Sequence, residues 1–375
     1  MRIAIVGGGA AGFMAAITAA EAGADVTLYE KSREFLSKVK ISGGGRCNVT
    51  HACFDAREFA TRYPRGEREL IGPLQRFGAR ETVEWFESRG VKLKTEADGR
   101  MFPVTDSSQT IIDCLVGAAK AAGVKLVTGQ TVNDFPSDCD RLLLATGGYR
   151  PTTSVFGHTI EPPVPSLFTF HIATPWLREL AGITVPEVEV SAAGLRERGP
   201  MLITHTGLSG PAILRLSAWG ARELHALDYR FPLAVNWLAN YRPEQSARLL
   251  VNTPMSPLPA RLWEQLVLAA GISRETRWSR LTREQNHQLQ WQLTQTEFAV
   301  SGKSMNKEEF VTCGGVRLSE VSFKTMESKL RPGLHFAGEV LDIDGITGGF
   351  NFQAAWTTGW IAGRAMACAR GSASI

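Results

Sequence analysis

The sequence predicts an α/β protein in which a parallel sheet is interrupted by a β-rich domain that carries a helical insertion. Short apolar segments rich in strand-forming residues stand near both ends of the chain, at 2–6, 124–128 and 333–339. The middle instead alternates short apolar runs with glycine and proline. At 375 residues and 44% hydrophobic, the chain is long enough for two or three domains.

The first predicted element is a strand that runs through a glycine-rich turn into a helix. RIAIV (2–6) is followed by GGGAAG (7–12), by an alanine-rich helix that ends at Gly23, and by a second strand, DVTLYE, that closes on Glu30. Gly7, Gly9 and Gly12 form the GxGxxG pattern between a strand and a helix, which predicts a dinucleotide site. The three glycines permit the tight turn, the approach of the pyrophosphate and close helix packing. Glu30 is placed to accept hydrogen bonds from a ribose diol, and its charge would repel a 2′-phosphate.

The sheet continues only much later in the chain. An NAD-binding domain normally adds further strand–helix units at once, but here the glycine-rich stretch KISGGGRCNVT (40–50) follows. Strands are predicted at 124–128 and in DRLLLATGG (140–148), and the last at 333–339 leads through a glycine-rich loop into a helix from about Asn351. Both ends of the chain therefore belong to one interrupted Rossmann-like domain.

The middle of the chain, from about Phe170 to Val311, contains no dinucleotide motif. Its first half predicts a small β-barrel or sandwich, and its second half becomes helical, with Thr282 and Gln285 as a capping box. Three tryptophans there are expected in the core rather than at a ligand: Trp263, Trp278 and Trp291. The expected domains are a cofactor domain at 1–169 and 312–375, a β-rich substrate domain at 170–242 and 299–311, and a helical subdomain at 243–298.

Composition limits the possible partners and compartments. The formal net charge is only +4, without a block of like charges or a basic stretch with interleaved aromatic residues, so no nucleic-acid partner is expected. No apolar run of about 18 residues predicts a membrane span, and the N-terminal apolar segment is too short for a signal peptide. The six cysteines show no CxxC pair, which favours free thiols and the cytoplasm. The seven histidines form no metal-binding pattern.

The chain resembles a family of bacterial FAD-dependent oxidoreductases that includes aminoacetone oxidase and a bile-acid-pathway flavin reductase, a branch of the flavoproteins with two dinucleotide-binding motifs. The matching segments are GGGAAG (7–12), SGGGRCNVT (42–50), GRMFPVTDSSQTIID (99–113), ATGG (145–148), GHTIEPPVPSL (157–167), THTGLSGPAIL (204–214), CGGVRLSEVSFKTMESK (313–329) and FAGEVLDIDGITGGFNFQAAWTTG (336–359). The resemblance spans nearly the whole chain and implies a Rossmann-like FAD-binding domain interrupted by a β-barrel-like domain, with FAD bound non-covalently.

The resemblance also implies where FAD binds. The backbone of Gly43, Gly44 and Gly45 is expected to lie along the diphosphate and under the isoalloxazine, with Arg46 as a phosphate or ribityl partner and Asn48 at the flavin edge. Cys47 is expected to be a small packed side chain rather than a redox thiol. Gly348 and Gly349 open the last helix, whose N-terminus would favour the negative charge of reduced flavin. Val132 resembles the position whose backbone holds the adenine. The other implied cofactor-binding residues are Ala10, Ala11, Lys31, Lys38, Ser42, Ala145, Thr146, Gly147, Gly338, Glu339, Asp342, Phe350 and Asn351.

The sequence and the family resemblance do not define which reaction the chain catalyses. His205 is the candidate for a polar catalytic group, although a lone histidine is more often structural. With only one nucleotide fingerprint, NADH or NADPH would bind transiently as reductant, or an amine or other reduced substrate would pass electrons to oxygen. A small-molecule substrate is expected. The alternatives are an RNA-modifying flavoenzyme and a flavin-binding protein without catalysis, and the oligomeric state is undetermined.

Two departures from the family pattern stand out. Only YRPTTSVF (149–156) separates ATGG from GHTI, where the family has a further glycine-rich turn and a helix near the cofactor. Position 51 is a histidine, where the family tends to have asparagine.

Overall fold

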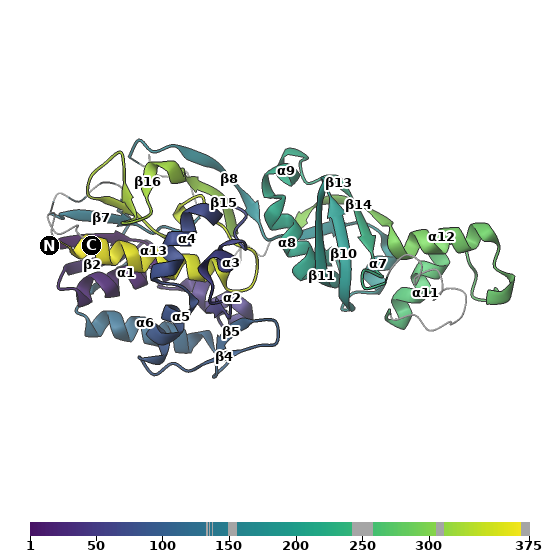
Figure 1. The fold of residues 1–375 in the computed structure, drawn as a ribbon, viewed down its shortest axis with the longest axis horizontal. Coiled ribbons are helices and arrows are strands. Elements are labelled where there is room, and N and C mark those ends of the chain that lie inside the picture. Colours follow the sequence, from purple (N-terminus) through teal and green to yellow (C-terminus); the bar gives the residue numbers. More distant parts are fainter. Residues whose placement is uncertain are drawn as a thin grey trace. The chain divides into compact units, whose positions relative to one another are not determined.

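The chain divides into two units, each built around its own sheet. The computed structural model describes residues 1–132, 134, 136, 138–148, 156–241, 258–304 and 311–368. The sheet unit comprises Met1–Val164 and Lys307–Ile375, and the barrel unit comprises Pro165–Asn306. The first and last parts of the chain thus share one unit, as the purple and yellow segments of Figure 1 show.

Seven strands form the main sheet of the sheet unit, in the order β16-β17-β18-β7-β1-β2-β6. The strands are β1 (Arg2–Val6), β2 (Asp25–Glu30), β6 (Lys125–Thr128), β7 (Arg141–Leu144), β16 (Val321–Ser322), β17 (Glu327–Ser328) and β18 (Leu334–Phe336). The five strands from β18 to β6 are parallel. Because β18 from the C-terminal segment pairs with β7 from the N-terminal segment, the predicted interrupted Rossmann-like sheet is confirmed.

Two helices pack closely against each other beside this sheet. They are α1 (Ala10–Glu21) and α13 (Phe350–Ala367), which lie side by side in Figure 1. A Cβ atom on Gly359 would lie 2.5 Å from the carbonyl oxygen of Ala11, and one on Gly363 would lie 2.5 Å from that of Ala15. The glycine residues of α13 therefore allow its backbone to approach that of α1 closely. The two helices pack together within the sheet unit.

The other elements of the sheet unit are helices and the strands of two smaller sheets. Two smaller sheets have the orders β3-β5-β4 and β15-β8. These elements are α2 (Ser37–Gly45), β3 (Thr50–His51), α3 (Ala56–Ala60), α4 (Glu67–Arg76), α5 (Ala79–Glu87), β4 (Leu93–Thr95), β5 (Arg100–Pro103), α6 (Ser108–Ala121), β8 (Ile160–Ser166), β15 (Val311–Val316), η2 (Leu318–Glu320) and η3 (Gly338–Val340). The shortened segment after Gly148 lies largely outside the described residues.

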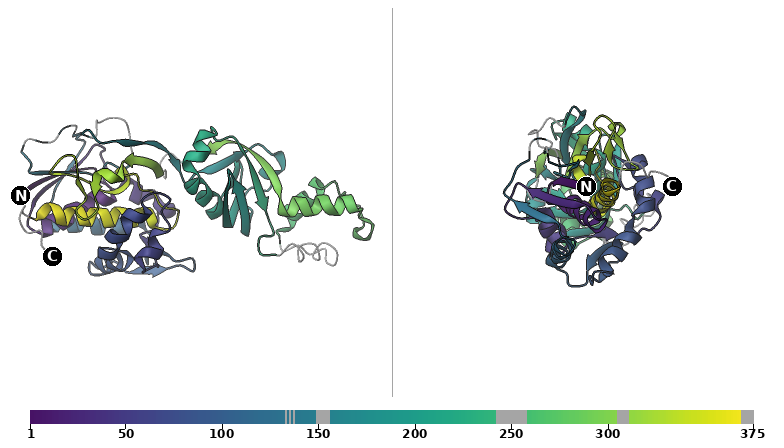
Figure 2. Two further views of the ribbon diagram at one scale, coloured as in Figure 1. Left: turned by 45° about the horizontal axis from the view of Figure 1, so that its top comes forward. Right: turned by 90° about the vertical axis from the view of Figure 1, so that its left-hand side faces the viewer.

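Six strands close into a barrel in the barrel unit, in the order β10-β11-β12-β9-β14-β13. They are β9 (Thr169–Ile172), β10 (Thr184–Ala192), β11 (Leu195–Thr204), β12 (Gly207–Ser209), β13 (Phe231–Asn236) and β14 (Thr296–Ser304), with helices α7 (Pro175–Glu179), α8 (Pro211–Trp219) and α9 (Ala221–Ala226). Burial alternates along β14, so one face of the strand fills the barrel. Figure 2 shows this barrel with α8 beside it, and the predicted β-barrel is confirmed.

A helical hairpin joins β13 to β14. It contains α11 (Ala260–Ala269), η1 (Trp278–Arg280) and α12 (Arg283–Thr294), and the part of the expected helical subdomain before residue 258 lies outside the described residues. The capping box is confirmed, because Thr282 Oγ1 accepts from the Gln285 N–H and Gln285 Oε1 accepts from the Thr282 N–H, each at 3.1 Å. Four leucines pack this hairpin onto the barrel core: Leu262, Leu266, Leu289 and Leu293.

The expected burial of the hairpin tryptophans is wrong for two of the three. Trp263 is partly buried against the core, but Trp278 and Trp291 are 37% and 40% exposed. A two-helix hairpin covers only the face it turns to the barrel, so large apolar residues on its other face stay at the surface. Separately, none of the helices among the described residues is long and apolar enough to cross a membrane.

Candidate functional site

The turn between β1 and α1 has the close approaches that a dinucleotide site needs. A Cβ atom on Gly12 would lie only 1.9 Å from the carbonyl oxygen of Gly7, so this position admits no side chain. A Cβ atom on Gly9 would meet nothing within 4 Å, so the turn has open space where a ligand would approach. Because the first amides of a helix lack intrahelical acceptors, those at the start of α1 are available to phosphate oxygens.

Glu30 ties the end of β2 to this turn. Its Oε2 accepts a hydrogen bond from the Gly8 N–H and its Oε1 accepts one from the Ser32 N–H, both at 2.8 Å. Each carboxylate oxygen keeps lone-pair capacity for a ribose hydroxyl. The N–H of Gln130 donates to the Glu30 carbonyl oxygen at 3.1 Å, so the chain that leads to Val132 passes beside Glu30.

The glycine-rich stretch forms a kinked, left-handed backbone segment. Gly43, Gly44 and Gly45 have φ values of 58°, 68° and 83°. In this left-handed region a residue with a side chain has a higher conformational energy than glycine. A Cβ atom on Gly44 or Gly45 would meet nothing within 4 Å, whereas one on Gly43 would lie 3.1 Å from Phe102. This open, side-chain-free backbone fits a flat cofactor, which is the use expected for it.

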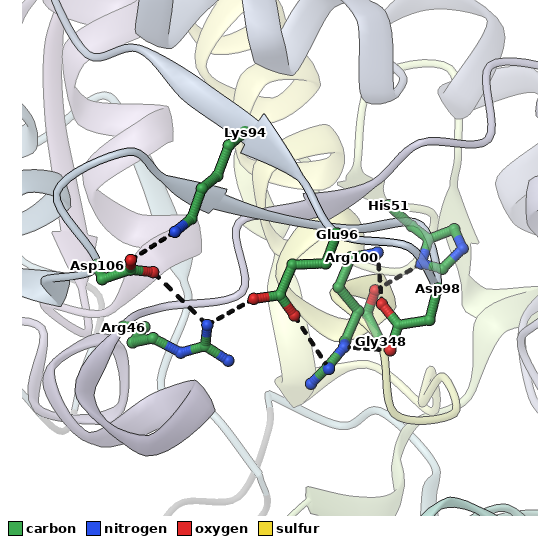
Figure 3. Close-up of polar contacts among 8 residues, drawn as sticks. All are labelled: Arg46, His51, Lys94, Glu96, Asp98, Arg100, Asp106 and Gly348. Carbon is green, nitrogen blue, oxygen red and sulfur yellow. Dashed lines mark hydrogen bonds and ion pairs between the residues drawn. The ribbon is translucent and has the colours of Figure 1, made fainter. Parts of the chain in front are cut away.

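Arg46 lies in a group of charges that the sequence analysis did not find. Its Nη1 donates to Glu96 Oε1 at 2.6 Å and lies 3.5 Å from Asp106 Oδ1 (Figure 3). The guanidinium also stacks over the Phe102 ring, 4.0 Å from its centroid. The Nε–H and Nη2–H groups have no hydrogen-bond partner among the described residues. Arg46 is thus held in one orientation while it keeps donors for an anionic ligand.

The charges around Arg46 all lie in one later stretch of chain, from Lys94 to Asp106. Arg100 contacts Glu96 at 3.1 Å and Asp98 at 2.7 Å, and Lys94 contacts Asp106. GRMFPVTD is part of the family resemblance, but nothing in its spacing predicts these partners. Only the pairing of β5 with β3 and β4 brings these residues to Arg46.

The thiol of Cys47 is fully buried beside the glycine loop. Burial raises the pKa of this thiol to about 12. A thiol that keeps its proton at neutral pH is a poor nucleophile, so the environment favours the packed side chain over the redox thiol.

We expect iodoacetamide at pH 8 to leave Cys47 unmodified in the folded protein while the exposed Cys368 reacts, as read by peptide mass mapping. The unfolded thiol loses its proton near pH ~8.5, whereas the folded thiol keeps it up to about 12. The unfolded state therefore binds fewer protons in this window, so Cys47 lowers stability as the pH rises through it. Modification of Cys47 at the rate of Cys368 would contradict the burial.

The N-terminus of α13 is tied to the segment after Cys47. A Cβ atom on Gly349, whose φ is 95°, would lie 2.5 Å from the Thr50 carbonyl oxygen. The Asn48 amide, oriented by its surroundings, accepts from the Gly349 N–H and donates to the Thr50 carbonyl oxygen, both at 3.0 Å. His51 Nδ1 lies 3.0 Å from the Gly348 carbonyl oxygen, and burial lowers the pKa of this histidine, so neutral His51 donates here.

Buried polar side chains lock α13 in this position. Thr50 Oγ1 donates to Gln353 Oε1 at 2.6 Å, and Gln353 Nε2 donates to Thr82 Oγ1 at 2.9 Å. Trp356 Nε1 donates to the Val49 carbonyl oxygen at 2.9 Å. The sequence analysis missed these residues, although polar side chains on an otherwise apolar, buried helix are a signal that could have found them.

The loop before α13 brings in two further acidic residues. Glu339 Oε2 lies 2.6 Å from Lys38 Nζ, and its Oε1 accepts from the Thr312 N–H at 2.8 Å. The fully buried Asp344 pairs with Arg65 through both carboxylate oxygens. Nearby, the N–H of Ala145 donates to the Val6 carbonyl oxygen at 2.8 Å, so the segment after β7 also reaches the β1–α1 turn.

The contacts above connect five segments of the sheet unit that carry expected cofactor residues, and their role in binding FAD stays a prediction. Phe350 is buried and stacks on His51 at 4.8 Å, and Asn351 exchanges two 2.8 Å hydrogen bonds with the Gly345 backbone. The candidate His205 belongs to the barrel unit, in the exposed turn between β11 and β12, and its side chain makes no hydrogen bond to the described residues. Its catalytic role stays a prediction.

Known proteins resemble this chain along almost its whole length. The HI0933-like protein Rossmann domain family matches residues 1–365. Ribosomal RNA dihydrouridine synthase of Escherichia coli strain K12 is 31% identical over 98% of each chain. The 3-dehydro-bile acid delta(4,6)-reductase of Clostridium scindens is 30% identical over 98% of this chain and 99% of that protein.

A solved structure shows the same fold. The 3-ketosteroid-delta4-(5alpha)-dehydrogenase of Rhodococcus jostii RHA1 has a TM-score of 0.51 and 14% sequence identity, over 98% of this chain and 96% of that chain. At this identity the likeness concerns the fold alone.

Proposed function

We propose that this chain, which belongs to the HI0933-like family and is a flavin-dependent oxidoreductase that binds FAD, reduces a carbon–carbon double bond conjugated to a carbonyl group. The observation that carries the proposal is a shared chemistry. Dihydrouridine is uridine with its 5,6 double bond saturated, and a delta(4,6)-reductase saturates ring double bonds of a 3-oxo steroid acid. In both substrates the double bond is conjugated with a carbonyl.

The site supports this chemistry through the residues that would hold FAD. The first turn of α1 and the open Gly9 would take the diphosphate, Glu30 the ribose, and the backbone of Gly43 to Gly45 the ring. When bound and reduced, FAD would supply a hydride to the carbon β to the carbonyl, and the α carbon would take a proton that comes from water. The N-terminus of α13, held by Asn48 and His51, would stabilise negative charge beside it.

We further propose a reduced nicotinamide as the electron donor. The sequence has a single GxGxxG fingerprint, so the nicotinamide would bind transiently. The amine-oxidase alternative has less support, because the names of both relatives describe reductions. One name gives a hydrogenated product, dihydrouridine, and the other calls the protein a reductase. The expectation that nucleic acid plays no part is unsupported, since one relative modifies ribosomal RNA.

The test is anaerobic mixing of the yellow protein with NADH, and separately with NADPH, followed by an acceptor. We expect bleaching of the flavin absorbance by one nicotinamide. A 4-en-3-one steroid, uridine or protein-free ribosomal RNA should then restore the absorbance, with two hydrogen atoms added to the product by mass spectrometry. Return of the absorbance only with oxygen, or bleaching by amines but by neither nicotinamide, would overturn the proposal.

A further inference from the structure

The loop between α11 and α12, together with the first residue of α12, carries a row of exposed arginines. Arg274, Arg277, Arg280 and Arg283 recur at every third position, and all four are exposed. The loop is ordered by its own hydrogen bonds, such as that from the Arg280 N–H to the Arg277 carbonyl oxygen at 2.8 Å. Gln285 Nε2 also donates to the Gly271 carbonyl oxygen at 3.4 Å and holds the two ends of the loop together.

These arginines form the strongest local charge excess of the hairpin. From Arg274 to Trp291, four arginines less Glu275 and Glu284 leave +2, against +4 for all 375 residues. Arg274 pairs with Glu264 at 2.6 Å. Arg277, Arg280 and Arg283 make no ion pair with any described residue. Three guanidinium groups that have no ion pair within the described part of the chain therefore point to an anionic partner.

Aromatic and amide side chains lie on the same hairpin. Trp278 is 37% exposed and stacks on Trp263, with ring centroids 5.9 Å apart and planes 22° from parallel. Trp291 is 40% exposed on α12, one helical turn beyond the exposed His287. The outward face of α12 is thus polar apart from one large ring, and it lacks the continuous apolar stripe by which a helix enters a lipid surface.

We propose that this arginine surface, defined as Arg274, Arg277, Trp278, Arg280, Arg283, His287 and Trp291, binds unpaired RNA. Arginine forks suit phosphate oxygens, and exposed rings stack on unpaired bases. The arginines are spaced by three and form no block of consecutive like charges, but with Trp278 among them they are a basic stretch with an interleaved aromatic residue, which the sequence-based expectation of no nucleic-acid partner overlooked. The inference rests on the proposed function, because it names a uracil ring in RNA as the conjugated acceptor.

The test compares two charge reversals in the barrel unit. The test variant is Arg277→Glu with Arg280→Glu, and the control is Arg196→Glu with Arg230→Glu, whose side chains are 71% and 75% exposed. Both change the net charge equally. With a fluorescein-labelled, uridine-containing single-stranded RNA, we expect roughly tenfold weaker binding for the test variant and a salt slope lower by roughly two. The control should stay within about twofold of the wild type, since its arginines contact no RNA.

A second variant examines stacking without a change of charge. Trp291→Ala should weaken binding roughly fivefold or more, because a ring–base stack is lost. Equal weakening by test and control variants, or no RNA binding by the wild type, would overturn the proposal. Binding of phosphatidylserine vesicles but not RNA would overturn it in favour of a membrane surface. Circular dichroism and flavin absorbance should show all three variants folded and loaded.

The same variants separate this inference from the proposed function. Bleaching by the nicotinamide and reduction of a 4-en-3-one steroid or free uridine should be unchanged in the test variant, while reduction of ribosomal RNA falls. If the wild type binds RNA but reduces no conjugated acceptor, the proposed function fails and the arginine surface stands. If small acceptors are reduced but RNA is not bound, the arginine surface fails and the reductase stands.

Discussion

Replacing Gly44 with valine is expected to give a folded protein that purifies without flavin. Gly44 has a φ of 68°, and open space surrounds the place where its Cβ would lie. A branched side chain there would project into the space proposed for the cofactor. It would also strain the backbone, because β-branched residues rarely adopt positive φ. Absorbance near the flavin maxima, relative to protein absorbance, measures the loss.

The control for this experiment separates backbone strain from obstruction of the cofactor. Gly123 follows α6, has a φ of 80° and likewise has nothing within 4 Å of its Cβ position. Gly123→Val therefore carries a similar backbone cost away from the proposed site and should purify yellow. A fully loaded Gly44→Val protein would refute the placement of flavin along this loop. If both variants purify without colour, the loss of flavin would be due to destabilisation of the fold.

Replacing Asp344 with alanine is expected to lower the free energy of unfolding by about 3–5 kcal/mol. The Asp344 side chain is fully buried, and the Arg65 side chain with which it pairs is only 14% exposed. Without the carboxylate, a largely buried guanidinium would lose the charge with which it pairs through two contacts. The pair also joins the chain before α4 to the loop before α13, so the variant should lose flavin more readily. Urea unfolding of the yellow protein measures the change.

A surface ion pair provides the comparison. Asp25 lies 3.4 Å from Lys125, with side chains that are 54% and 67% exposed. Asp25→Ala should cost less than about 1 kcal/mol, because solvent already screens both charges. Equal, small losses for the two variants would show that Asp344 gains little from its buried partner.

Much of the fold follows from local sequence patterns. The β1–α1–β2 unit was predictable because strand, turn and helix each leave a mark within about ten residues, and Gly12 confirms the physical reason with its 1.9 Å approach to Gly7. The capping box at Thr282 and Gln285 is equally local. The glycine loop at 43–45 was recognisable because only glycine tolerates three successive left-handed residues.

The sequence by itself thus determined the class of fold, the interrupted domain and the dinucleotide turn. Only the tertiary structure decided which charges surround Arg46, how Gln353 and Trp356 lock α13, and that Trp278 and Trp291 face outward beside the arginines. The physical reason is the distance along the chain between the residues that decide each feature. Turns and periodic burial depend on neighbours along the chain, whereas ion pairs, buried hydrogen bonds and exposure depend on segments that meet only when the chain folds.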